Sequence, residues 1–176
     1  TTLITGPSKL ASPKGIKVKK IISADEMLVE VKKTLPVDLA VCTAAVVDFK
    51  PITKSKNKIK KDKLNFKSIN FIKNNDILDF LSKNNKNRPQ IVAGFSAETK
   101  DVIKNSIQKM KSKNCDFIFA NNVSKEGVGF NSDFNKVSVI DQRGKIKVIP
   151  KNKKSFIANK IAQILLDKLL DDRNFN

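Results

Sequence analysis

Polar side chains lie at the ends of several apolar runs of this chain, where a hydrophobic core has no use for them. They are Asp48, Glu98, Asn121 and Asn122. Small residues surround these positions, in the strings GPS (6–8), TAAVVD (43–48) and GFSAET (94–99), and leave the backbone open to a ligand. In open α/β sheets, ligands bind beyond the carboxyl ends of the strands. Turn formation and helix capping explain each group singly, but the set together favours a ligand site.

Lysines near these positions could hold phosphate groups. Lys109 and Lys113 are four residues apart in a predicted helix, so they share one face and could reach the same phosphate chain. The alternative is an ordinary solvated helix face. The string KIKK (58–61) is either a basic loop or a flap that closes over a polyphosphate. The chain has neither GxGxxG nor GxxxxGK(S/T), so any phosphates would be held by lysines and backbone amides.

The absence of histidine excludes whole reaction classes. A Ser-His-Asp triad, a Cys-His dyad and a histidine-bound zinc are all impossible. Acid–base catalysis would fall to Asp, Glu, Lys or Cys. The two cysteines, Cys42 and Cys115, provide no disulfide framework and predict reduced, buried thiols of a cytoplasmic protein. No apolar run approaches the about 18 residues of a membrane span, and no signal-peptide pattern is present.

The charge balance raises a second function class. Lys and Arg number 35 against 17 Asp and Glu, a net charge of +18. A non-catalytic basic α/β module that binds nucleic acid or acidic partners is therefore the alternative, and it predicts strongly salt-dependent binding. Only Arg88, Arg143 and Arg173 are arginines, and aromatic residues are not interleaved with the cations. A lysine-rich solvated surface, compatible with a small anionic ligand such as a nucleotide, is the preferred interpretation.

Strand and helix patterns alternate along the 176 residues. The predicted strands are 1–6, 15–23, 37–47, 64–72, 90–98, 115–122 and a hairpin pair within 136–150. The predicted helices begin at Ser23 with a capping box to Glu26, at 75–76, at Thr99 or Asp101, and at 155. We predict a single α/β domain over 1–176, a three-layer Rossmann-like open sheet, mostly parallel, with an antiparallel hairpin near one edge.

A series of motifs then follows one another in a characteristic order. They are TLITGPS, SADEM, CTAAVVDF, KIKK, KNNDIL, AGFSAET, KNCDFIFAN and GFNSDFN. Together they resemble the phosphopantothenoylcysteine synthetase family, commonly the carboxy-terminal half of the bifunctional phosphopantothenoylcysteine decarboxylase/phosphopantothenate–cysteine ligase of coenzyme A biosynthesis. The resemblance covers nearly the whole chain, to about residue 170.

The resemblance implies a ligation without a protein nucleophile. The family joins 4′-phosphopantothenate to L-cysteine, and bacterial members with this pattern use CTP where eukaryotic relatives use ATP. The substrate carboxylate attacks the α-phosphate and gives an acyl-cytidylate and pyrophosphate; the cysteine amine then displaces CMP. Lysines and Mg²⁺ would neutralise the charge. FMN is implied only if a decarboxylase half is fused upstream.

The resemblance also implies roles for particular residues. Lys58, the first lysine of KIKK, resembles the flap lysine of the activation step, Phe95 a residue that packs against the nucleotide, and Lys109 with Lys113 a triphosphate-binding pair. Asn75 stands where many relatives have proline. The implied nucleotide-binding residues are Thr43, Ala44, Asp48, Lys58, Lys73, Asn74, Asn75, Asp76, Phe95, Lys109 and Lys113. The implied substrate-binding residues are Gly6, Ala45 and Asn121, and no residue is assigned to a metal.

The family is dimeric, so the resemblance implies a homodimer, or a higher oligomer through a fused decarboxylase. The segments 9–23 and 123–136 are the candidates for an extension that reaches the partner. The family's glycine-rich amino-terminal stretch, with an Asn that processes the acyl-cytidylate, comes before the strand that opens this chain and is not among the 176 residues. We therefore expect a fragment in which cytidylate formation persists in part while completion fails.

Overall fold

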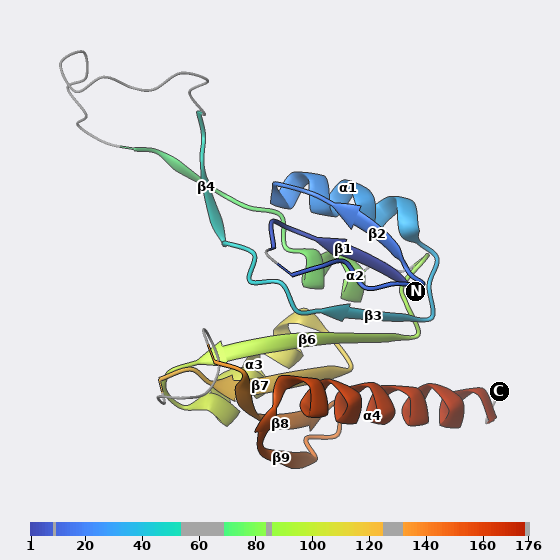
Figure 1. Ribbon diagram of the computed structural model, residues 1–176. Helices are drawn as coiled ribbons and strands as arrows, with labels where there is room; N and C mark the ends of the chain where they lie inside the picture. The colour runs from blue at the N-terminus through green and yellow to red at the C-terminus, as the bar shows by residue number, and fades with distance from the viewer. Residues whose placement is uncertain (9, 54–68, 84–85, 125–131, 175–176) are drawn as a thin grey trace. The chain divides into compact units, whose positions relative to one another are not determined.

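The computed structural model describes residues 1–8, 10–53, 69–83, 86–124 and 132–174 (Figure 1). The described chain forms two compact units. The first unit comprises Thr1–Lys33 and Ala44–Asp76, and the second comprises Thr34–Thr43 and Ile77–Asn176.

The second unit is built on a five-stranded sheet. Its strands, in spatial order, are β3 (Leu39–Cys42), β6 (Ile91–Glu98), β7 (Phe117–Asn122), β8 (Phe134–Asp141) and β9 (Ile146–Lys153). The first three run parallel, β8 runs antiparallel to β7, and β9 pairs antiparallel with β8 at the far edge. Gly144, in the hairpin turn, has a φ of 78°, a conformation that glycine adopts without strain. The predicted hairpin is confirmed.

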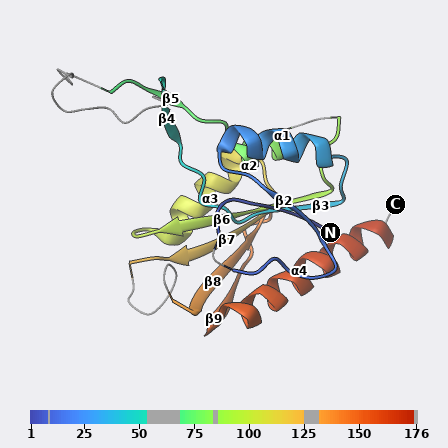
Figure 2. The same cartoon turned by 45° about the horizontal axis from the view of Figure 1, so that its top comes forward.

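Helices cover both faces of this sheet. Helix α4 (Lys154–Asn174) lies on one face, and α2 (Ile77–Lys83) and α3 (Val102–Lys113) lie on the other (Figures 1 and 2). Alternate strand residues such as Ile91 and Phe119 join the core under α4. Gly94 faces the opposite way, where an added Cβ would lie 2.6 Å from Leu78 Cδ2 of α2. The predicted three-layer α/β fold with a mixed sheet is confirmed.

Strand β3 differs from its prediction. The apolar run 37–47 predicts a buried parallel strand; β3 does run parallel to β6, but it is only four residues long and Val41 is 41% exposed. Among the described residues, β3 pairs with β6 alone. Its apolar composition therefore does not correspond to burial within the described sheet.

The first unit contains a parallel strand pair and a helix. Strands β1 (Thr2–Thr5) and β2 (Lys17–Lys20) pair in parallel, and α1 (Ala24–Thr34) follows. The predicted capping box is confirmed, because the Glu26 N–H donates to Ser23 Oγ (3.2 Å) and the Ser23 hydroxyl donates to Glu26 Oε1 (3.1 Å). The Ile22 N–H also donates to Glu26 Oε2 (2.9 Å), so the box orders the entry to α1.

An antiparallel ribbon completes the first unit. It is formed by β4 (Phe49–Pro51) and β5 (Phe71–Lys73), and it extends away from α1 and the β1–β2 pair (Figure 1). Several of its large apolar side chains, and those beside it, are exposed: Val47, Phe49, Ile52, Ile69, Phe71 and Ile72. The predicted basic flap, with Lys58, lies outside the described residues.

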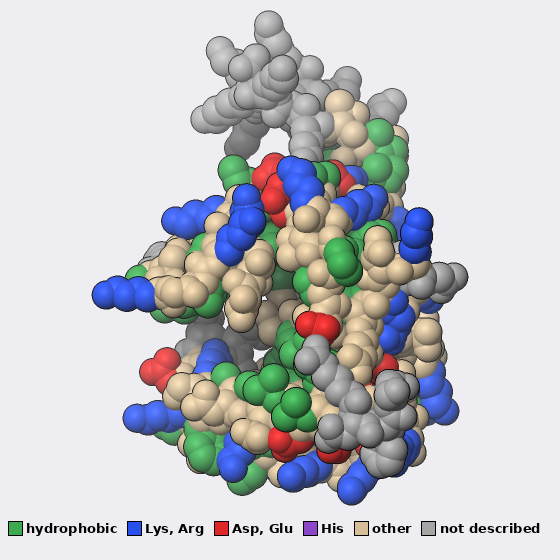
Figure 3. Space-filling view, turned by 90° about the vertical axis from the view of Figure 1, so that its right-hand side faces the viewer, with side chains coloured by type: hydrophobic (Ala, Val, Ile, Leu, Met, Phe, Trp, Pro, Cys, Tyr) green, Lys and Arg blue, Asp and Glu red, His purple; other side chains and the backbone are tan. Residues whose placement is uncertain are grey.

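The surface carries the excess of lysines predicted from the composition. On the face shown in Figure 3, Lys and Arg side chains are spread between acidic and apolar groups rather than gathered into one stripe. Within the described ranges, the structure contains no helix that is both long and apolar enough to cross a membrane.

Candidate functional site

The residues predicted to bind ligand divide between the two units. The first unit holds Gly6, Ala44, Ala45, Asp48, Lys73, Asn74, Asn75 and Asp76. The second holds Thr43, Phe95, Lys109, Lys113 and Asn121. Lys58 lies outside the described residues.

In the first unit, the structure brings two predicted nucleotide-binding segments together. The Asn74 backbone N–H donates to the Asp48 carbonyl (2.7 Å), and its side-chain amide donates to the Val47 carbonyl (3.1 Å). The Asn75 N–H donates to Asn74 Oδ1 (3.1 Å). Segments 44–48 and 73–76 are therefore hydrogen-bonded to each other at the base of the β4–β5 ribbon, although they are far apart in the sequence. The Asp48 and Lys73 side chains remain exposed there.

In the second unit, the carboxyl ends of the parallel strands meet at one edge, as the topology predicts. Thr43 follows β3, Glu98 ends β6, and Asn121 and Asn122 end β7. Ala97 is paired in register with Asn121. The polar residues singled out from the sequence of this unit therefore share one edge of the sheet.

Glu98 is held by two neighbours that the sequence did not single out. The Ser96 hydroxyl, fully buried, donates to Glu98 Oε1 (2.7 Å), and the Asn105 amide reaches Oε2 (3.4 Å). The i,i+2 spacing of Ser96 and Glu98 on one strand face was the available signal. Asn105 lies on α3 and was detectable only from the three-dimensional structure.

The start of α3 also differs from its prediction. Asp101 occupies the N-cap position but has a left-handed φ of 46°, and its side chain makes no capping hydrogen bond. The Asn105 amide instead donates to the Lys100 carbonyl (3.0 Å). The position of the cap was predicted correctly, while its side-chain capping was wrong.

The two lysines of α3 already have partners within the fold. Lys109 Nζ donates to the Phe95 carbonyl (3.0 Å), and Lys113 Nζ lies 3.6 Å from Asp79 Oδ1 on α2. Asp79 also pairs with Lys83 at 2.7 Å. An anionic ligand that binds Lys109 and Lys113 would therefore have to replace these existing contacts.

Phe95 packs against the core while remaining partly exposed. Its ring centroid lies 5.1 Å from that of Phe119, with the ring planes tilted by 45°. This contact fixes the ring orientation from below and leaves part of the ring accessible. Such an arrangement is compatible with packing against a base.

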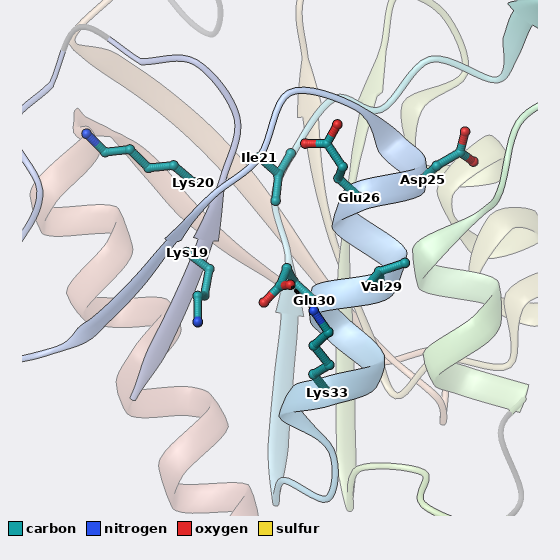
Figure 4. Close-up of a pocket in the computed structure, with 8 residues that line it drawn as sticks. All are labelled: Lys19, Lys20, Ile21, Asp25, Glu26, Val29, Glu30 and Lys33. Atoms are coloured by element: carbon teal, nitrogen blue, oxygen red, sulfur yellow. Dashed lines mark hydrogen bonds and ion pairs between the residues drawn. The ribbon is translucent and has the colours of Figure 1, made fainter.

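A separate hollow of about 570 Å³ lies in the first unit between β2 and α1 (Figure 4). Its lining mixes both signs of charge, and none of the residues predicted to bind ligand contributes to that lining. Lys33 donates to Glu30 Oε1 (2.7 Å), and this hydrogen bond lowers the pKa of the Glu30 carboxyl. In the part of the chain that the structure describes, no cluster of three or more Asp, Glu, Cys or His side chains could hold a metal ion.

Known proteins match almost the whole chain. Residues 1–169 match the family described as DNA/pantothenate metabolism flavoprotein C-terminal domain. The Coenzyme A biosynthesis bifunctional protein CoaBC of Borreliella burgdorferi is 40% identical over 166 residues, which are 93% of this chain and 41% of that protein. The protein of the same name from Escherichia coli is 35% identical over 182 residues, 98% of this chain and 43% of that protein. This chain thus spans about two fifths of the length of these curated relatives.

Solved structures share the fold. The crystal structure of the C-terminal domain of Coenzyme A biosynthesis bifunctional protein CoaBC has a TM-score of 0.73 and 26% identity, covering 97% of this chain and 76% of that one. A Cab2 variant in complex with phosphopantothenate-cysteine has a TM-score of 0.65 at 16% identity, over 92% of this chain and 56% of that one, which is a likeness of fold. The resemblance inferred from the motifs is confirmed. The chain belongs to the family of the DNA/pantothenate metabolism flavoprotein C-terminal domain.

Proposed function

We propose that this chain is a phosphopantothenate–cysteine ligase of coenzyme A biosynthesis. The observation that carries the proposal is the family match over residues 1–169, with relatives named as coenzyme A biosynthesis bifunctional proteins at 35–40% identity. The Cab2 variant of the same fold was solved with phosphopantothenate-cysteine, the compound that this reaction would form.

The proposed reaction has two steps, and both nucleophiles belong to substrates. A carboxylate oxygen of 4′-phosphopantothenate attacks the α-phosphorus of CTP, and the bond to pyrophosphate breaks. The cysteine amine then attacks the acyl carbon of the acyl-cytidylate, CMP leaves, and the amine loses a proton as the amide forms. The absence of histidine supports this scheme, because the protein has only to position the reactants and to stabilise charge.

Cations would overcome the repulsion between a carboxylate and a triphosphate. Lys109 and Lys113 lie on one face of α3, and we assign them to the triphosphate. Mg²⁺ usually takes its protein ligands sparingly and binds through substrate phosphates and water. Because the described residues include no acidic cluster for a metal, we expect the nucleotide to bring the ion with it.

The test is cysteine-dependent release of pyrophosphate from CTP in the presence of 4′-phosphopantothenate, with ATP as the comparison nucleotide. It should be run on the whole protein that carries this chain. Nucleotide binding alone should appear as thermal stabilisation, since a ligand at 100 times its Kd stabilises the folded state by about 2.7 kcal/mol. Pyrophosphate release that ignores cysteine and phosphopantothenate would refute the ligase, and a preference for ATP would correct the nucleotide.

Lys58 is the residue we assign to the activation step. Replacement by Gln removes the charge but keeps much of the side-chain length, so turnover should fall about 100-fold or more, as for loss of one electrostatic contact to the transition state. Lys145, exposed in the β8–β9 turn, provides the matched control through Lys145→Gln. Equal activity of the two variants would refute the role of Lys58.

We also propose a homodimer located in the cytoplasm. The exposed apolar side chains of the β4–β5 ribbon support a partner contact there, alongside the candidate segments 9–23 and 123–136. No disulfide bond is present among the described residues, which fits a reducing compartment. Light scattering after gel filtration should give twice the chain mass, and Phe71→Ser should shift the population towards monomer. A wild-type protein that elutes as a monomer would contradict the dimer.

A further inference from the structure

A single carboxylate joins three separate parts of the first unit. Asp25, in the first turn of α1, accepts hydrogen bonds from Lys50 Nζ on both oxygens (2.7 and 2.6 Å). Its Oδ1 also accepts one from the Asn75 side-chain amide (2.8 Å). Lys50 belongs to β4, and Asn75 lies between β5 and α2. We refer to these three residues as the Asp25 clamp.

The Asp25 clamp contacts the chain beside both segments of the predicted nucleotide site, 44–48 and 73–76. Lys50 lies two residues after Asp48, and Asn75 is the neighbour of Asn74, whose N–H donates to the Asp48 carbonyl (2.7 Å). The Asp25 carboxylate therefore holds both chains just beside the point where they contact each other. Asp25 also belongs to the lining of the hollow between β2 and α1, and Figure 4 shows its carboxylate pointing to the side of α1 away from β2.

Exposure indicates that the clamp positions these segments more than it stabilises the fold. The side chains of Asp25 and Lys50 are 48% and 23% exposed, and ion pairs so accessible to water contribute little to global stability. Their geometry is nevertheless specific, since three charge-assisted hydrogen bonds of 2.6–2.8 Å converge on one group.

The hydrogen bond from Asn75 to Asp25 can restrain the backbone of segment 73–76. A proline at that position would restrict φ through its ring, whereas asparagine leaves the backbone freer when the segment is not held. Here the asparagine side chain is tied to Asp25 instead. A hydrogen bond between distant residues thus supplies the restraint that a ring would supply locally.

We infer that Asp25 is a positioning residue for nucleotide binding: through Asn75 and Lys50 it holds segments 44–48 and 73–76 in their ligand-ready arrangement. The inference rests on the proposed function, because it assigns the held segments to the nucleotide. It gives Asp25 no contact with the reacting atoms. An ordinary exposed ion pair that only favours the start of α1 is the competing explanation.

The test is a double-mutant cycle on nucleotide affinity. Asp25→Ala should raise the KM and the Kd for CTP by about five- to twentyfold with kcat nearly unchanged, a coupling typical of residues in direct contact. In the Asn75→Pro background, the same Asp25→Ala change should alter the Kd less than about twofold, because the ring then restrains the backbone. Glu30→Gln is the matched control: Glu30 forms an ion pair of 2.7 Å with Lys33 on the same helix, so the change should leave the affinity unaltered.

A ligand-free measurement separates this inference from the proposed function. In the unliganded protein, Asp25→Ala should speed hydrogen exchange at the Asn74 amide, which donates to Asp48, and Asn75→Pro should suppress that increase. Unchanged exchange at Asn74, or equal effects of Asp25→Ala in both backgrounds, overturns the inference. Wild-type protein that binds no CTP overturns the nucleotide assignment and with it the ligand-ready role of Asp25, whereas the exchange result still decides whether the clamp holds the two segments.

Discussion

Replacing Arg88 should destabilise the second unit more than any exposed charge would. Its guanidinium donates to the Ser82 carbonyl (2.9 Å), the Pro89 carbonyl (2.9 Å) and the Asn114 carbonyl (3.2 Å). It also pairs with Asp116 Oδ2 at 2.8 Å. The acceptors come from the end of α2, the start of β6 and the turn between α3 and β7. The Arg88 side chain thus holds these three segments together at the edge of the sheet where β6 and β7 begin.

The size of the effect follows from the burial of this pair. The Arg88 and Asp116 side chains are 24% and 17% exposed, and loss of one partner of a buried pair costs about 3–5 kcal/mol. Asp116 keeps the Val92 N–H (2.6 Å) and the Gln142 amide (2.7 Å), which lessen the cost of its charge. We therefore expect Arg88→Ala to lower the free energy of unfolding by about 3 kcal/mol. Arg88→Lys should cost about half as much, because lysine keeps the charge but not the fork of donors.

Urea unfolding followed by circular dichroism measures these losses as shifts of the midpoint at unchanged slope. Arg143, exposed in the β8–β9 turn, is the matched control, and Arg143→Ala should cost less than about 0.5 kcal/mol. A cycle with Asp116→Asn should show a coupling of about 1–3 kcal/mol. A loss below about 1 kcal/mol for Arg88→Ala, or equal losses for Lys and Ala at this position, would refute the reasoning.

Three further substitutions test the packing of the second unit. Ser106→Ala should raise the free energy of unfolding by about 1 kcal/mol, because the buried Ser106 Oγ has no hydrogen-bond partner in the described structure; a less stable variant in thermal denaturation would contradict this. Gly94→Ala should lower that free energy by about 1–3 kcal/mol in urea, since its Cβ would lie 2.6 Å from Leu78; an unchanged midpoint would argue against the tight contact. Burial raises the pKa of the Cys115 thiol from 9.0 to about 11, so the folded state resists its ionisation. Stability from this thiol should persist below pH 9 and fall by about 2 kcal/mol by pH 11, a loss that Cys115→Ala should remove.

Local signals in the sequence predicted local structure well. Ser23 and Glu26 form the capping box that their spacing predicts, and Gly144 makes the hairpin turn. The alternation of apolar residues indicated which elements are strands, and the order of elements indicated the three layers. These features depend on neighbours a few residues apart, so one sequence suffices to find them.

Contacts between distant residues could not be predicted in this way. The Arg88–Pro89 pair reads from the sequence as a connection between elements, although Arg88 reaches Asp116, 28 residues away. In the sequence, Asn75 is notable only because it stands where many relatives have proline. Its hydrogen bond to Asp25 could not be predicted, because the two residues are 50 positions apart. Val41 lies in a strand-like apolar run yet is 41% exposed, since burial depends on which strands lie alongside.

The lysines show why composition alone misleads about ligands. The net charge of +18 predicts a broad attraction for anions, but three lysines beside the predicted site already have partners within the described fold. Lys50 is held by Asp25, Lys109 by the Phe95 carbonyl and Lys113 by Asp79. A bound phosphate gains only the difference between its own contact and the one it replaces, so affinity depends on the geometry of several replacements together. Under the proposed function, a triphosphate that contacts Lys109 and Lys113 together would make two such replacements at once.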